Sequence, residues 1–170
     1  MNDRRTIWIG NDHGGFELKM ALMPYLEAQG YRVHNVGCDS PAIAPYPYYA
    51  AQVASAVTRG EADRGILICS TGIGMCIVAN KFKGVRAALC TDSYMGRMTA
   101  AHNDANILCL GGQVIGRLHA LDIVDCWLRT PYEGGRHEIS LDLIRDAEET
   151  LCTGRLWHGG EEEGPEERER

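Results

Sequence analysis

Short apolar runs alternate with longer amphipathic stretches along most of this 170-residue chain. The runs are rich in branched side chains, which is typical of buried strands. The longer stretches repeat their apolar positions at helical spacing, as Phe16, Leu18, Leu22 and Leu26 do. The pattern predicts strands over 6–10, 31–36, 65–69, 86–90 and 106–110, and helices over 15–29, 46–59, 75–83, 92–103, 114–128 and from the loop 133–137 to 152.

This alternation predicts one fold class. Strands that alternate with helices across short connections form a doubly wound parallel sheet, with helices on both faces. We therefore expect an α/β protein with a single domain over residues 1–156. Residues 157–170 are acidic and rich in Gly, Glu and Arg, which predicts a disordered, solvated tail.

Composition and charge narrow the possible partners. Hydrophobic residues make up 45% of the chain and charged residues 24%, as in ordinary globular proteins. The net charge is −6, and Glu161 to Arg170 contribute −4 of it, so the rest of the chain is nearly neutral. A neutral body argues against nucleic-acid binding. The apolar runs are all far shorter than the roughly 18 residues of a membrane span, so no membrane partner is expected.

The chain has seven cysteines, without a C-x-x-C pair or a zinc-type spacing. Several lie inside apolar runs, as reduced core cysteines do. These features predict a cytoplasmic protein without a metal site.

The third predicted strand ends in Cys69, and Ser70, Thr71, Gly72, Ile73 and Gly74 follow at once. This order predicts a tight loop that leads into a helix at the carboxyl end of a strand, where α/β proteins bind ligands. The first turn of a helix offers unpaired N–H groups and a positive dipole end. We expect a thiol in that position to ionise more easily than a free one.

Known cofactor motifs do not match this loop. Gly72 and Gly74 lack the third glycine of a dinucleotide fingerprint, and the chain has no G-x-x-x-x-G-K-[S/T] phosphate loop. A thiol phosphatase needs an arginine six residues after its cysteine, where this chain has Met75. We therefore expect no bound cofactor.

Other polar residues lie near strand ends. Asp12 and His13 follow the first strand, His102 and Asn103 precede the fifth, and Arg136 follows two glycines in a loop that could clamp an anion. Each has a simpler interpretation: His13 as a helix cap, His102 as a structural histidine, Arg136 as a surface residue and Cys69 as an apolar filler. The simplest role for the remaining residues of interest is structural, and these are Cys76, Cys90, Cys109, Cys126, Cys152 and the segment 46–49.

Taken together, seven segments resemble the ribose-5-phosphate isomerase B and galactose-6-phosphate isomerase family. The likeness extends from about Ile7 to Glu148. It implies a Rossmann-like three-layer α/β/α sandwich with a five-stranded parallel sheet, and metal-free aldose–ketose isomerisation of a sugar phosphate in the pentose phosphate pathway. It also implies a homodimer or a dimer of dimers with shared active sites. The segments are 11–19, 60–65, 68–75, 79–81, 84–88, 102–106 and 133–137.

The resemblance assigns roles to individual residues. Cys69 resembles the base that moves a proton between C1 and C2 through a cis-enediolate, in a chain that has Met75 where some members have their basic Glu. Thr71 resembles the residue that orients the thiol, His102 the ring-opening acid/base and Asn103 an oxyanion donor. The residues that resemble substrate contacts are Asp12 for a sugar hydroxyl, His13 and Arg136 for the phosphate, and Ser70, Gly72 and Gly74 in the loop.

Two positions depart from the family pattern. Gln113 and Ser140 stand where ribose-5-phosphate members usually have phosphate-binding arginines. Each loss removes a charge-assisted contact. One alternative is therefore the same chemistry on a tetrulose phosphate, a hexose phosphate or a free sugar. Another is a non-catalytic subunit that binds sugar phosphates.

Overall fold

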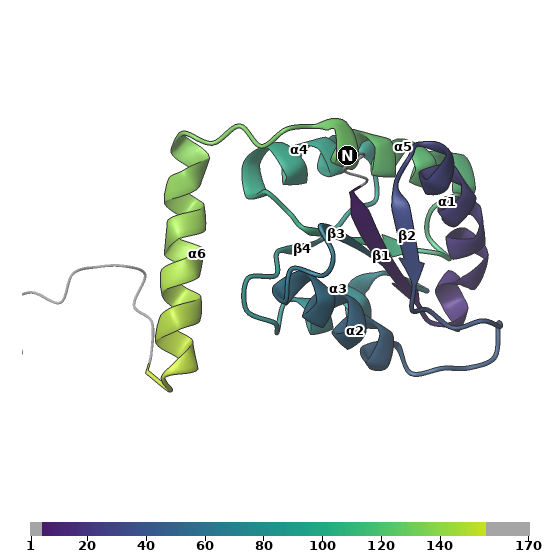
Figure 1. Cartoon of the computed structure of the whole chain (residues 1–170), viewed down its shortest axis with the longest axis horizontal. Coiled ribbons are helices and arrows are strands. Elements are labelled where there is room, and N and C mark those ends of the chain that lie inside the picture. Colours follow the sequence, from purple (N-terminus) through teal and green to yellow (C-terminus); the bar gives the residue numbers. More distant parts are fainter. Residues whose placement is uncertain (1–4, 156–170) are drawn as a thin grey trace, which may run out of the picture. The chain divides into compact units, whose positions relative to one another are not determined.

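Strands and helices follow one another in the order that the sequence pattern predicts (Figure 1). The computed structural model describes residues 5–155, so the predicted tail at 157–170 lies outside the described part. Contacts divide the chain into two units, one ending at Glu133 and one beginning at Gly134. The single domain over residues 1–156 stays a prediction, and the two units are described separately.

The observed elements lie within a few residues of the predicted ones. Predicted helices beginning at 75 and 114 begin instead at Ile73 and Arg117. Gly72 has a φ of 79°, a left-handed conformation that starts the third helix early. The strands are β1 (Thr6–Asn11), β2 (Arg32–Asn35), β3 (Arg64–Cys69), β4 (Ala87–Leu89) and β5 (Ile107–Gly111). The helices are η1 (His13–Gly15), α1 (Phe16–Ala28), α2 (Tyr46–Thr58), α3 (Ile73–Ala79), α4 (Ser93–Asn103) and α5 (Arg117–Arg129) in the first unit, and α6 (Arg136–Cys152) in the second.

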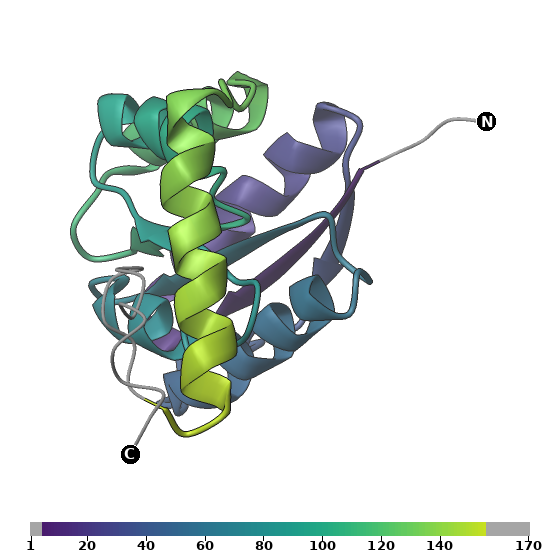
Figure 2. The ribbon, with the colours of Figure 1, turned by 90° about the vertical axis from the view of Figure 1, so that its left-hand side faces the viewer.

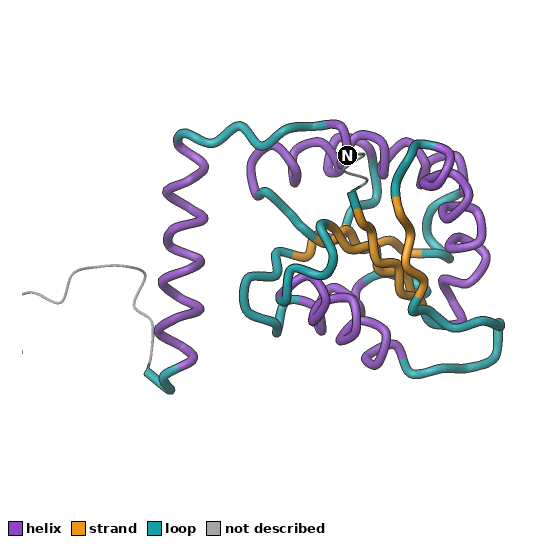
Figure 3. Tube along the Cα trace, viewed as in Figure 1, coloured by secondary structure: helices purple, strands orange, loops and turns teal. Residues whose placement is uncertain are grey.

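The strands form one parallel sheet in the order β2-β1-β3-β5-β4, which confirms the predicted fold class (Figure 3). Asn11 pairs with Ile68, and Cys69 pairs with Gly111. The ends of β1, β3 and β5 therefore meet at one edge, called here the carboxyl edge. The opposite edge, where β3 and β5 begin, is the amino edge.

Helices cover both faces of this sheet (Figure 2). On one face α1, α4 and α5 bury an apolar cluster against Ile9, Ile66 and Leu108. On the other, α2 and α3 pack against Leu67 and Cys109. Because neighbouring strand residues point to opposite faces, Cys69 belongs to the α2/α3 layer. No helix between residues 5 and 155 is long and apolar enough to cross a membrane.

A buried lysine fixes the loop after β2 against α1. Lys19 is 1% exposed, and its Nζ donates to the Cys38 carbonyl at 2.6 Å and to Asn35 Oδ1 at 3.3 Å. Burial lowers the pKa of Lys19. Cys38 Sγ in turn accepts a hydrogen bond from the Asn11 amide at 3.2 Å, so the loop is tied to the carboxyl end of β1.

Candidate active site

Cys69 is the last residue of β3, and its sulfur has a backbone donor. The residue is 5% exposed, and the Gly72 N–H donates to Sγ over 3.1 Å. A thiolate accepts such a bond more strongly than a neutral thiol does. A backbone N–H of the loop therefore donates to the side chain of Cys69, which precedes the loop, and this bond orients the sulfur.

The first turn of α3 supplies further N–H groups beside this sulfur. The first backbone bond within the turn runs from the Cys76 N–H to the Gly72 carbonyl, so the N–H groups of Ile73, Gly74 and Met75 have no acceptor in the helix. The Ile73 N–H donates to Thr71 Oγ1 over 3.3 Å. The Gly74 and Met75 amides are available to an oxygen held at the loop.

Replacing Gly72 by alanine should disrupt this loop. A Cβ at Gly72 would lie 2.5 Å from Leu89 Cδ1 and 2.9 Å from the Leu110 carbonyl carbon, in addition to the strain of a φ of 79°. We expect Gly72→Ala to lower the free energy of unfolding by about 2–4 kcal/mol, measured by urea denaturation.

Gly84→Ala is the matched control, since Gly84 has a φ of 76° and nothing within 4 Å of an added Cβ. It carries the conformational strain without the collision, so its cost should be about 1–2 kcal/mol. Equal costs for the two variants would contradict a tightly packed loop.

Asp12 and His13 follow β1 at the carboxyl edge, beside the Cys69 loop. Asp12 is 5% exposed, and its Oδ1 accepts from the Gly14 N–H at 2.9 Å. Asp12, rather than His13, thus caps the first turn. His13 Nδ1 accepts from the Ala44 N–H at 3.4 Å, which leaves Nε2 to carry the proton of the neutral ring. Ser70 reaches the same place, because its Oγ would lie 2.2 Å from a Cβ at Gly14.

Gln113 lies at the carboxyl edge too, two residues after the end of β5. Its backbone N–H donates to the Ser70 carbonyl over 3.0 Å, and the neighbouring Gly112 N–H donates to the Cys69 carbonyl over 2.8 Å. The Gln113 side-chain amide reaches the Gly14 carbonyl at 3.5 Å. The structure thus brings together Cys69, Ser70, Thr71, Gly72, Gly74, Asp12, His13 and Gln113.

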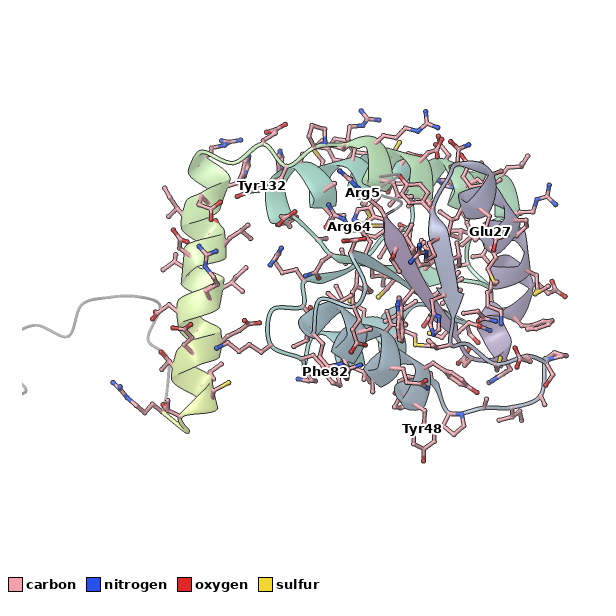
Figure 4. All side chains as sticks on the ribbon, viewed as in Figure 1. Arg5, Glu27, Tyr48, Arg64, Phe82 and Tyr132 are labelled. Carbon is pink, nitrogen blue, oxygen red and sulfur yellow. The ribbon has the colours of Figure 1, made fainter. Side chains whose placement is uncertain are left out.

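Sequence reasoning assigned no site role to Tyr46, which also borders this loop. Tyr46 begins α2 and is 39% exposed, and its ring would lie 2.8 Å from a Cβ at Gly74. The tyrosine-rich segment 46–49 gave no signal that separates a pocket wall from ordinary packing. By contrast, Tyr48 points away from the ribbon into solvent (Figure 4).

His102 and Asn103 lie at the amino edge. They end α4, and Asn106, three residues later, accepts the Gly65 N–H at the start of β3. Arg64, labelled in Figure 4, is the first residue of β3 and lies at this edge. Its guanidinium lies over the Trp127 ring, 5.4 Å from the ring centroid. At about 3.3 Å per residue, β3 separates the two edges by roughly 15 Å. Within the first unit, His102 and Asn103 therefore do not meet Cys69.

The amino edge fixes these two residues firmly. His102 Nε2 lies 3.7 Å from a Glu133 carboxylate oxygen. Arg86 Nε donates to the Asn103 carbonyl at 3.0 Å, and Arg86 also pairs with Asp104 at 2.7 Å. Asp104 ends α4 in a left-handed conformation with a φ of 43°.

Arg136 and Ser140 belong to the second unit. Arg136 is the first residue of α6, Ser140 lies one turn later, and both are exposed. Gly134 and Gly135, with φ values of 65° and 59°, precede the helix. The helix begins at Arg136, inside the predicted loop 133–137, so Arg136 is helical rather than part of the loop.

Comparisons with known proteins agree with this architecture. Residues 7–144 match the sequence model of the family described as Ribose/Galactose Isomerase. The chain is 45% identical to ribose-5-phosphate isomerase B of Escherichia coli strain K12. The matched segment of 145 residues covers 85% of this chain and 97% of that relative.

Two further relatives differ in their named activity. A solved structure of Clostridium thermocellum ribose-5-phosphate isomerase B superposes with a TM-score of 0.84 at 49% identity, over 86% of this chain and 99% of that one. D-erythrulose-4-phosphate isomerase of Pectobacterium atrosepticum is 42% identical over 131 residues, or 76% of this chain and 86% of the relative.

Proposed function

Because the chain belongs to the ribose/galactose isomerase family of sugar-phosphate isomerases, we propose that it interconverts ribose 5-phosphate and ribulose 5-phosphate. The observation that carries the proposal is the Cys69 sulfur at the carboxyl edge, oriented by the Gly72 N–H and followed by the free amides of Gly74 and Met75. That set offers a base and an oxyanion cradle side by side.

In the proposed reaction Cys69, as thiolate, removes the proton from C2 of the open-chain aldose. The electron pair moves to the C1 carbonyl oxygen and forms a cis-enediolate. The proton then returns to C1, the C2 hydroxyl gives up its proton as that oxygen becomes the ketone, and the C1 oxygen takes up a proton to become a hydroxyl. Amides aimed at the developing oxyanion supply several kcal/mol in comparable sites, and a positioned base contributes a factor of roughly 10²–10⁴.

The remaining residues keep the roles that the family resemblance implies. Asp12 holds a sugar hydroxyl through the carboxylate oxygen that Gly14 leaves unused. Thr71 Oγ1 accepts from the Ile73 N–H, so its own proton is free to donate. The resemblance assigns His13 and Arg136 to the phosphate, and it assigns Gln113 and Ser140 to the positions of two family residues that contact the substrate. Side chains and backbone amides perform each step, and no metal or cofactor enters it.

A second copy of the chain completes the proposed site. His102, which opens the ring, and Asn103, an oxyanion donor, lie at the amino edge, so one copy cannot bring them to its own Cys69. A homodimer that places the amino edge of one subunit against the carboxyl edge of its partner supplies both. Exposed apolar residues support such a contact: Ile73 and Ile77 on α3 are 50% and 57% exposed, and Ile139 and Leu151 on α6 are 65% and 58% exposed.

A different substrate is the second candidate function. Gln113 is neutral and reaches toward the Gly14 carbonyl rather than presenting a charge to a phosphate. A relative at 42% identity is named a D-erythrulose-4-phosphate isomerase, which shows that other sugars occur in the family. A tetrulose phosphate, a hexose phosphate or a free sugar would fit this change.

An isomerase screen of phosphorylated and free four- to six-carbon sugars distinguishes these candidates. We expect kcat/KM to be highest for ribose 5-phosphate, and Gln113→Arg with Ser140→Arg should then change KM little. A tetrose or hexose substrate that exceeds ribose 5-phosphate would establish the second candidate. Binding without turnover of any sugar would establish a non-catalytic subunit. The seven free cysteines fit a reducing cytoplasm, which we propose as the location.

A further inference from the structure

The turn over 103–106, called here the α4–β5 turn, follows the two site residues of the amino edge. Asn103 ends α4 and is exposed, and His102 before it is partly exposed. Asp104 has a φ of 43° and is the only residue other than glycine with a positive φ between residues 5 and 155. This conformation is unfavourable for a residue with a Cβ, so neighbouring contacts must stabilise it.

Arg86 supplies several of these contacts from the position directly before β4. Its Nε donates to the carbonyls of Asn103 and Asp104, over 3.0 Å each. Its Nη2 donates to the Asp104 carbonyl over 2.8 Å and to the Asp104 carboxylate over 2.7 Å. The last carbonyls of a helix have no donor within the helix and carry the negative end of its dipole. One guanidinium therefore satisfies the end of α4 and binds the left-handed residue as well.

The backbone of Arg86 is fixed to the same turn. Its N–H donates to Asn106 Oδ1 over 2.8 Å, and its carbonyl accepts from the Asn106 N–H over 3.1 Å. The Asn106 side-chain amide also donates to the Gly84 carbonyl over 2.8 Å. Because the backbone and the side chain of Arg86 both bind residues 103–106, its guanidinium has little freedom to leave the α4–β5 turn.

A second guanidinium binds the next carbonyl of this turn. Arg64 donates to the Ala105 carbonyl, which also accepts from the Trp127 indole N–H over 3.0 Å. Arg64 Nη2 lies 4.0 Å from an oxygen of the Asp104 carboxylate. Its contact with the backbone is thus further along the chain from the site residues than the contacts of Arg86 are.

We propose that Arg86 is a positioning residue of the isomerase, which holds His102 and Asn103 in the arrangement that the site of a second copy requires. This role rests on the proposed function and its shared site. The family resemblance assigns roles to His102 and Asn103 but none to Arg86. Arg86 acts only through the α4–β5 turn and does not contact the sugar. A misplacement of about 1 Å can cost a hundredfold in rate, so a loosened turn should slow the reaction.

Replacing Arg86 by methionine should lower kcat about 10- to 100-fold and change KM by less than about twofold. Methionine is unbranched and donates no hydrogen bond, and the proposed phosphate contacts lie elsewhere. Arg59→Met is the matched control. Arg59 lies at the C-cap of α2 and also donates two hydrogen bonds to a carboxylate, that of Glu61, over 2.8 Å each. It should retain the kcat of wild type. An unchanged kcat in Arg86→Met would overturn the proposal.

Mixed dimers locate the defect at one edge of the sheet. Each site of the proposed dimer combines the carboxyl edge of one subunit with the amino edge of the other. Arg86→Met mixed with Cys69→Ala should therefore form one working site per mixed dimer. Arg86→Met mixed with His102→Ala should form none, because both subunits then have a defective amino edge. With random exchange we expect about a quarter of wild-type activity in the first mixture and no gain in the second.

A general loss of folding would not produce this difference between the two mixtures. Arg86→Gln, whose shorter neutral side chain cannot form the same four bonds, is mixed in the same way in case Arg86→Met does not fold. If neither variant restores activity to Cys69→Ala, Arg86 supports the whole subunit and the proposal is wrong. If either restores activity to His102→Ala, its effect lies at the carboxyl edge, which is equally contradictory.

Amide hydrogen exchange tests the hold on the α4–β5 turn without any sugar. The N–H groups of Asp104 and Ala105 both donate to the Thr99 carbonyl. We expect both to exchange at least about tenfold faster in Arg86→Met than in wild type or Arg59→Met, because charge-assisted bonds to the turn are lost. Unchanged exchange would overturn the proposal even if wild type isomerises sugars. Faster exchange in a chain whose wild type isomerises no sugar would instead refute the proposed function.

Discussion

Replacing Cys69 by alanine should lower isomerase kcat by at least about a hundredfold, because a positioned base contributes a factor of roughly 10²–10⁴. The sulfur is the only part that the substitution removes. The Gly72 N–H that donates to it at 3.1 Å would lose its acceptor, but the loop keeps the Gly112 and Gln113 backbone bonds. Steady-state kinetics on the best sugar phosphate measure the effect.

Cys90→Ala is the control for this substitution. Cys90 is also a buried cysteine, 1% exposed against 5% for Cys69, and it follows a strand of the same sheet. Both substitutions therefore delete one buried sulfur and should cost similar free energy of unfolding. We expect only Cys69→Ala to lose turnover. Similar activity in the two variants would remove Cys69 as the base.

Mixing two inactive variants should restore activity. Cys69→Ala and His102→Ala each disable one edge of the sheet, and in a shared site these edges come from different subunits. Mixed dimers then contain one site with both substitutions and one with neither. With random exchange, half of the dimers are mixed, so about a quarter of wild-type activity should return.

The rescue has a strict control. The double variant Cys69→Ala/His102→Ala mixed with wild type places one substitution in each site of a mixed dimer, so its mixed dimers should be inactive. Recovery should follow subunit exchange in time, after brief mild denaturation or prolonged incubation. Absence of recovery in dimers shown to be mixed would contradict a site shared between the two edges.

Much of this architecture is readable from the sequence, for a physical reason. The run of branched apolar residues in β3 and the helical spacing of apolar residues in α1 indicate which parts of these elements are buried. Gly72 indicates a left-handed turn, which glycine adopts more freely than other residues. Chain order alone also places Cys69 and His102 at opposite edges, because a helix that precedes a parallel strand must end where that strand begins.

Contacts between elements are less accessible to such reasoning. Cys76 on α3 and Cys109 on β5 share one core cluster because α3 packs against β5 in one particular register, and periodicity specifies a buried face but not the neighbour across it. Tyr46 is similar, since its place beside Gly74 depends on how the long connection 37–45 returns to the sheet. The roles of Arg136 and Ser140 depend on where α6 docks, and the local pattern of apolar and polar residues does not predict that position.

The central claim is that Cys69 moves a proton between C1 and C2 of the sugar. Exchange of that proton with solvent tests the claim most directly. Isomerisation in deuterium oxide should place deuterium at C2 of the aldose formed by the wild-type enzyme, as detected by NMR. The same incubation with Cys69→Ala should leave the recovered sugar unlabelled. Turnover without deuterium in wild type, or undiminished labelling by Cys69→Ala, would contradict proton transfer by this thiol.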